Sequence, residues 1–214
     1  MIIRTLLISC SMLALSGCSS AYYGAMEKLG YEKRDILVDR VEQASDAQGD
    51  AQETFQSALE QFQQVIGTPE SELNSVYQDI NSAFEDSQAA AKRVSDRIDQ
   101  VEKVAEDLFD EWETELGEYS NANLRRQSEQ QLNDTRRQYN ALVRQMRQVE
   151  SRMQPVLTAF QDQVLYLKHN LNAQAIGALK GELGRIESDV TSLIKNMQQS
   201  IAESEAFIAR FKSP

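Results

Sequence analysis

The hydrophobic side chains of this chain recur at alternating spacings of four and three residues, in four long runs. The first run begins Leu37, Val41, Ala44, Gln48, and the last ends near Phe211. Alternating steps average 3.5 residues, a period that keeps one stripe of each helix against a neighbour along a supercoil. The runs predict four helices, over residues 36–66, 69–116, 123–169 and 173–212.

The stripes are not purely apolar. Gln48, Ser87 and Gln163 occupy stripe positions where an apolar residue is usual. In the last run the rhythm holds as far as Met197, after which we expect a stutter before Phe207. Extra apolar residues widen the stripe locally, which suits a helix with more than one neighbour.

The breaks between the runs carry residue types that end and start helices. Gly67 reads as the end of one helix, Thr68 as the N-cap of the next and Pro69 as its first residue. Polar turns are expected at 117–123 and 169–172. The chain has only 9 glycines and 3 prolines in 214 residues, so other turns are few and the helices are long.

The connections between the runs are short, which forces neighbouring helices to run antiparallel. The sequence therefore predicts an all-α protein, an elongated antiparallel helical bundle or coiled coil of about four long helices. It leaves open a closed four-helix bundle, two longer hairpins, or pairing between chains. Pro155 lies inside the third run and lacks a backbone N–H, so we expect a kink there.

Charge divides the predicted helices into an acidic and a basic part. Residues 39–118 hold 21 acidic and 5 basic side chains, whereas residues 121–214 hold 9 acidic and 13 basic ones. In an antiparallel hairpin the two stretches beside the 117–123 turn lie next to each other, and their opposite charges can fix the register. The net charge of −11 argues against nucleic acid as a partner.

The N-terminus has the pattern of a targeting segment. Arg4 precedes an apolar run of about ten residues, which is the length of a secretory signal and too short to span a bilayer. The run ends in the tetrad from Leu15 to Cys18 (LSGC), which resembles the cleavage and acylation site of bacterial lipoproteins. By that resemblance Cys18 becomes an N-terminus carrying acyl chains such as palmitate. Ser19, in place of Asp, favours sorting to the outer membrane.

Three segments follow from these features. Residues 1–17 are the predicted lipoprotein signal peptide, residues 18–34 the acylated Cys18 with a membrane-proximal tether, and residues 35–214 the helical bundle. The tyrosines and basic residues of the tether suit a membrane–water interface, although the tether could instead pack back on the bundle. Cys10 leaves with the signal peptide, so the mature chain has no free thiol for a disulfide, a metal or a nucleophile.

The sequence offers no catalytic or metal site. Its single histidine is His169, and Tyr166 stands where a bundle di-iron motif needs Glu. It has no Gly-x-Ser-x-Gly elbow, and its acids lack the spacing of a calcium loop. We therefore expect no enzyme activity, no cofactor and no metal, and interpret residues 167–182 as a capped helix junction. Glycines at helical spacing in the last run are expected to permit close helix contact: Gly177, Gly181 and Gly184.

A resemblance to a family covers essentially the whole mature chain. It is carried by the acylation tetrad, by Gly30 to Arg34 before the first helix, and by Leu167 to Asn172. On these residues the chain resembles an uncharacterised family of Gram-negative helical lipoproteins, catalogued as a domain of unknown function. The resemblance implies a periplasmic, lipid-anchored helical protein and brings no catalytic residues.

The expected function is that of an envelope lipoprotein, anchored through Cys18 in the outer membrane and facing the periplasm. Its bundle would be a non-catalytic scaffold, spacer or adaptor that contacts a protein partner or a second copy through its helices. The alternative is a periplasmic ligand-binding module, with the ligand between helices near Leu157 to Leu171, where the apolar stripe is wider. A membrane-remodelling protein would need an insertable apolar hairpin, and no run after residue 18 is apolar enough.

Overall fold

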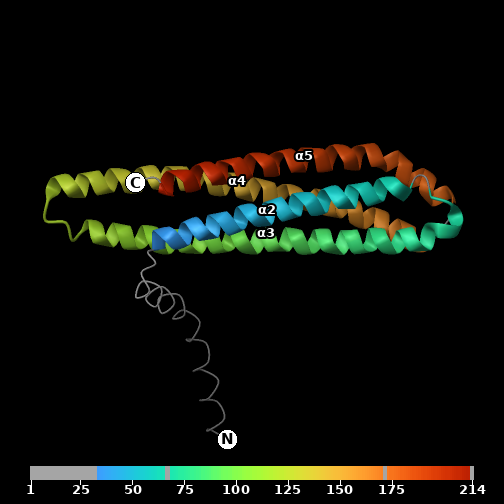
Figure 1. The fold of residues 1–214 in the computed structure, drawn as a ribbon, viewed down its shortest axis with the longest axis horizontal. Helices are drawn as coiled ribbons and strands as arrows, with labels where there is room; N and C mark the ends of the chain where they lie inside the picture. The colour runs from blue at the N-terminus through green and yellow to red at the C-terminus, as the bar shows by residue number, and fades with distance from the viewer. Residues whose placement is uncertain (1–32, 66–67, 171–172, 213–214) are drawn as a thin grey trace, which may run out of the picture.

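A computed structural model describes residues 33–65, 68–170 and 173–212, which form one long four-helix bundle (Figure 1). The predicted signal peptide, Cys18 and the tether as far as residue 32 lie outside the described residues. The prediction of an all-α antiparallel bundle is confirmed. The long helices are α2 (Lys33–Gln64), α3 (Leu73–Leu116), α4 (Ala122–His169) and α5 (Ala173–Lys212).

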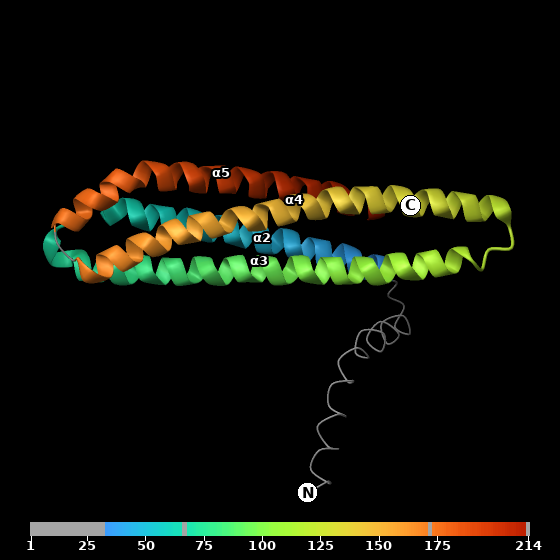
Figure 2. The same cartoon turned by 180° about the vertical axis from the view of Figure 1, so that it is seen from behind.

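The four helices close into a ring. Helix α2 packs against α3 and α5, and α4 packs against the same two helices, so α2 and α4 lie diagonally opposite. Each helix runs antiparallel to the next along the chain, as the two opposite views show (Figure 1, Figure 2). Of the arrangements left open by the sequence, the single chain adopts the closed bundle.

The predicted stripes form one continuous core along the bundle axis. The core reaches across the full width of the bundle, because phenylalanines of the diagonally opposite helices α2 and α4 meet at its centre: Phe55, Phe62 and Phe160. The ring centroid of Phe160 lies 6.2 Å from that of Phe55 and 4.7 Å from that of Phe62. Burial of such a stripe, more than helix propensity, is what holds long helices together in water.

The stripe of α5 continues without a stutter, so that prediction was wrong. After Met197 the buried positions are Ser200, Ser204 and Phe207, which keep the alternation of three and four. The hydroxyl of Ser204 donates to the carbonyl oxygen of Ser200 at 2.9 Å, one turn back. This local bond satisfies the hydroxyl and lets a small polar residue occupy a core position.

The breaks before α4 and before α3 have different outcomes. Before α4 the expected polar turn is present, and the helix starts at Ala122, one residue before the expected 123. No N-cap was predicted there: Asn121 takes that position, and its side chain accepts from the backbone N–H groups of Asn123 and Leu124. Before α3 the prediction was wrong: Glu70–Glu72 form a 3₁₀ turn, η2, and α3 starts only at Leu73. The Thr68 hydroxyl donates back to the carbonyl of residue 64 instead and closes the end of α2.

The sequence predicted effects of a proline in α4 and of glycines in α5, and all of these residues lie on the outward faces of their helices. Helix α4 continues through Pro155, which is exposed and has no backbone N–H to donate to the carbonyl of residue 151, and the kink expected there stays a prediction. The predicted close contact at the α5 glycines was wrong. A Cβ added at each would meet nothing within 4 Å, because they lie outside the stripe: Gly177, Gly181 and Gly184.

The helices are unequal in length, and this shapes one end of the bundle. Helices α3 and α4 have 44 and 48 residues, against 32 in α2 and 40 in α5. The α3–α4 hairpin therefore projects beyond the start of α2 and the end of α5 (Figure 1, Figure 2). We call residues 112–131 the overhang, and the four-helix part the body.

Candidate functional site

The overhang differs from the body in having no apolar core of its own. Ser128 is its one buried residue, and Trp112 and Leu116 are half-buried. Tyr119 is 41% exposed and Leu124 is 51% exposed. Within the described residues the only other exposed large hydrophobic side chains belong to the opposite end of the bundle.

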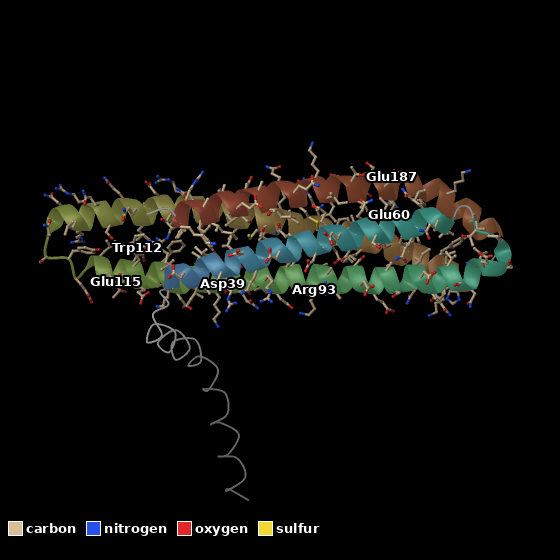
Figure 3. The ribbon with its side chains drawn as sticks, viewed as in Figure 1. Asp39, Glu60, Arg93, Trp112, Glu115 and Glu187 are labelled. Carbon is tan, nitrogen blue, oxygen red and sulfur yellow. The ribbon has the colours of Figure 1, made fainter. Side chains whose placement is uncertain are left out.

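Trp112 marks the point where the body ends. Its side chain lies between α3 and α4 just beyond the start of α2 (Figure 3). The indole Nε1 donates to Oγ of Ser128 at 2.8 Å, which ties α3 to α4 across the hairpin. Because Trp112 is the single tryptophan of the chain, it reports on this place alone.

Three contacts hold the ends of α2 and α5 at the base of the overhang. Lys33 Nζ lies 3.1 Å from Oε1 of Glu111 on α3. The guanidinium of Arg34 donates to the carbonyl of Phe211 on α5 at 3.1 Å. A Lys212–Glu42 ion pair at 3.6 Å joins the same two helices. The first residue of α2 is thereby fixed beside the overhang.

Arginines of α4 pair with acids of α3 along the seam next to the overhang. The guanidinium of Arg147 donates to both carboxylate oxygens of Glu102, at 3.1 and 2.5 Å, to Asp99 at 2.6 Å and to Glu150 at 2.8 Å. The bond to Glu102 is the largest influence that raises the pKa of Arg147 above its ordinary value. The predicted pairing of acidic α3 with basic α4 is confirmed at this residue.

A second junction on that seam combines charge with aromatic rings. Arg136 pairs with Glu113 at 2.6 Å and stands 4.9 Å over the ring of Phe109. The ring of Phe109 meets that of Tyr139 edge-on, with the centroids 5.3 Å apart. Desolvation by burial, followed by the charge of Glu102, raises the pKa of Tyr139 to about 12. These contacts fix the register of the hairpin that carries the overhang.

The far end of the bundle is the predicted junction near His169. Leu165 and Tyr166 are 49% and 37% exposed on the last turns of α4. The side chain of Asn170 donates to the carbonyl of Tyr166 at 2.9 Å, which closes the helix end. His169 is exposed, and no group of three or more potential metal ligands occurs among the described residues.

The wider apolar stripe near Leu157 to Leu171 lies only partly inside the bundle. Leu157, Val164 and Leu167 are buried in the core, Leu165 is exposed, and Leu171 lies outside the described residues. An open groove of about 500 Å³ lies elsewhere, between α4 and α5 on the body side of the overhang, and is lined in part by Leu142 and Phe207. The described helices include none with the length and hydropathy of a membrane span.

The fold and this arrangement define a class of protein: a long antiparallel four-helix bundle with a two-helix overhang at the end where its first helix begins. The chain belongs to the family described as protein of unknown function (DUF2959), whose model matches residues 22–211. The predicted membership of an uncharacterised family is confirmed. The chain matches no curated protein and no solved structure.

Proposed function

We propose that this protein is an envelope lipoprotein, held through an acylated Cys18 in the outer membrane, whose helical rod is a scaffold, spacer or adaptor on the periplasmic side. The signal for the anchor is the tetrad from Leu15 to Cys18. Acyl chains bind a bilayer in proportion to their length, by about 0.8 kcal/mol for each buried CH₂ group.

The observation that supports the proposal is the position of the first residue of α2, close to Cys18 in the sequence and at one end of the four-helix part of the bundle. Helix α2 begins at Lys33, only 15 residues after Cys18, and it begins at one end of the bundle (Figure 1). The 48 residues of α4 span about 72 Å at 1.5 Å per residue. An anchor on one end of such a rod holds the other end far from the membrane, which is the geometry that a spacer or adaptor needs.

The far end offers the surface for a partner. Leu165 and Tyr166 stand exposed there, and Lys168 and His169 add polar groups beside them. Partly exposed Leu and Tyr side chains with a polar rim are typical of protein contacts. The proposed partner is a periplasmic or envelope protein that binds this end.

The anchor is tested by the variant Cys18→Ser, with Cys10→Ser as the matched control. The wild-type chain and Cys10→Ser are expected to incorporate labelled palmitate and to sediment with the outer membrane. Cys18→Ser is expected to incorporate none. Labelling that survives Cys18→Ser, or a wild-type chain that is never labelled, would contradict the anchor.

The adaptor role is tested by crosslinking in intact cells. The double variant Leu165→Ser with Tyr166→Ser is expected to lose the crosslinked partner, while Tyr119→Ser with Leu124→Ser keeps it. The two pairs match in residue type and in exposed fraction, so both leave the core intact. A partner captured equally by both variants would show that the far end is not the contact.

A further inference from the structure

The four helices of the ring are not joined to one another in the same way. Helices that follow each other in the sequence are connected by short segments of the chain, which hold the seams α2–α3, α3–α4 and α4–α5. Helices α2 and α5 are the first and the last of the described helices, so the chain does not connect them directly. The seam between α2 and α5 is therefore closed by packing and side-chain contacts alone.

The polar contacts across this seam gather at its overhang end. The two that the structure describes are the bond from Arg34 to the carbonyl of Phe211 and the Lys212–Glu42 ion pair. Both side chains of the ion pair are more than half exposed, and exposed pairs contribute little to stability. An open groove of about 400 Å³ also lies between the two helices here, lined in part by Arg34 and Phe211. This end of the seam is therefore only weakly closed.

Further into the bundle, the core at this seam is polar. The described residues include seven buried polar side chains, and four of them lie in residues 45–48 of α2 and 200–204 of α5. Gln48 and Ser200 are both 0% exposed, and among the described residues no polar atom of either side chain has a hydrogen-bond partner. A buried polar atom without a partner costs free energy that contact with water would recover.

The two polar stretches lie at the same level of the bundle. The contacts made by Arg34 and by Lys212 fix how α2 and α5 are shifted along each other. Gln48 lies 14 residues after the α2 partner of the first contact and 6 after that of the second. The same steps back along the antiparallel α5 reach residues 197 and 206, and Ser200 lies within this range. The amide and the hydroxyl therefore belong to one layer of the core.

The other two helices are apolar at this level. The hydrogen bond from Arg97 to Gln43 and the stacked rings of Phe55 and Phe160 give the matching levels on α3 and α4. The buried residues there are all apolar: Ala90, Val94, Ile98, Val149, Met153 and Val156. Alanine and serine bury less apolar surface than valine, isoleucine or methionine, so α2 and α5 contribute less to the core in this layer.

We propose that the ring opens between α2 and α5 at the polar layer, defined as residues 44–51 and 197–204, while the other three seams stay closed. Opening hydrates the amide of Gln48 and the hydroxyl of Ser200, and it breaks no connection of the chain. Helices separated from their apolar cover are marginal in water, so both stretches then lose the protection of their backbone hydrogen bonds. The opening is a property of the fold and does not rest on the proposed function.

The test measures amide hydrogen exchange of the full chain by mass spectrometry. Residues 44–51 and 197–204 are expected to exchange at least about ten-fold faster than residues 90–98 and 149–156, which lie at the same level on α3 and α4. Equal exchange in the four stretches would overturn the proposal, because a bundle that unfolds only as a whole exposes all four together.

A covalent bridge distinguishes opening of this seam from fraying of single helices. In a full chain with Cys10 and Cys18 replaced by serine, the variants Glu42→Cys and Lys212→Cys are joined by a flexible bismaleimide linker. The bridge should reduce the exchange of the polar layer to that of the stretches on α3 and α4. Fast exchange that survives this bridge would overturn the proposal.

The matched control bridges the same helix to its other neighbour. Gln43→Cys and Arg97→Cys, which replace a hydrogen-bonded pair across the α2–α3 seam, are joined by the same linker. Because that seam stays closed in the proposed opening, the fast exchange of the polar layer should persist. Its loss with this bridge as well would overturn the assignment of the opening to the α2–α5 seam.

The role of the polar layer itself is tested by Gln48→Leu, with the exposed Gln63→Leu as the control. Leucine leaves no amide to hydrate, so the exchange of residues 197–204 on the opposite helix should slow several-fold. Gln63→Leu should leave it unchanged. Equal exchange of residues 197–204 in both variants would overturn the place given to the opening.

Discussion

Trp112 and Ser128 join the two helices of the overhang through one hydrogen bond of 2.8 Å between the indole N–H and the serine hydroxyl. Ser128 is buried, and Trp112 packs against the end of the core. The pair therefore lies at the one place where the hairpin leaves the support of α2 and α5. Removing this hydrogen bond should therefore destabilise the overhang before the rest of the bundle.

The variant Ser128→Ala should destabilise the protein by about 1 kcal/mol, because the half-buried indole N–H loses its acceptor. Urea unfolding followed by Trp112 fluorescence measures both the midpoint and the local environment of the ring. The exposed Ser188→Ala on α5 serves as the control and should change stability by less than about 0.5 kcal/mol. Equal midpoints for both variants would contradict the role given to this bond.

The variant Arg147→Gln should destabilise the bundle by about 1–2 kcal/mol at low salt, because one guanidinium joins three carboxylates across α3 and α4. The loss should shrink at about 1 M salt, where the screening length falls to about 3 Å. Chemical denaturation at both salt concentrations measures it. Arg137→Gln, which breaks only the exposed pair with Asp134 inside α4, should have almost no effect.

The variant Gln48→Leu should stabilise the bundle by about 1–2 kcal/mol. Gln48 is 0% exposed on the core stripe of α2, and among the described residues neither polar atom of its amide has a hydrogen-bond partner. Leucine fills a similar volume and leaves no polar atom buried. The urea midpoint measures the gain, with the exposed Gln63→Leu as the control. A loss of stability would show that the amide is held by an internal water.

Tyr139 should make the stability of the bundle fall at high pH. Burial raises its pKa from 10.0 to about 12, so the folded state keeps the phenolic proton between these values while the unfolded state releases it. The contribution of this proton is complete below pH 10 and is lost as the pH approaches 12. Urea midpoints between pH 9 and about 12 should therefore decline less steeply for Tyr139→Phe than for the wild type. Parallel curves would contradict the assignment.

Much of the bundle could be predicted from the stripes. Buried positions recur every three or four residues along each helix, and this recurrence is visible in the sequence wherever the buried residue is apolar. The same reasoning failed at Ser200 and Ser204, because both residues are buried although neither is hydrophobic. The hydroxyl of Ser204 bonds to the carbonyl of its own preceding turn, whereas the hydroxyl of Ser200 has no hydrogen-bond partner among the described residues. The reasoning failed at Thr68 because the hydroxyl serves the helix before it and not the one after. Composition distinguishes neither case.

The overhang was not predicted, although a signal for it existed. The expected ranges for the middle two helices were already longer than the others, and unequal helices in a closed bundle must leave an unsupported end. The position of that end depends on the register between helices. The register follows from specific contacts, such as Lys33 with Glu111 and Arg147 with Glu102, which charge counts alone do not specify.

The inequality of the four helices also makes the rod mechanically uneven. In the body a sideways load must bend four helices that share one core, whereas beyond Glu111 the described residues form only two helices. A pull between the turn at 117–121 and the far end must pass through the overhang and will therefore be absorbed at its base. The body should behave as a stiff rod and the overhang as a more compliant extension, and force–extension measurements between these two points should find the overhang yielding first.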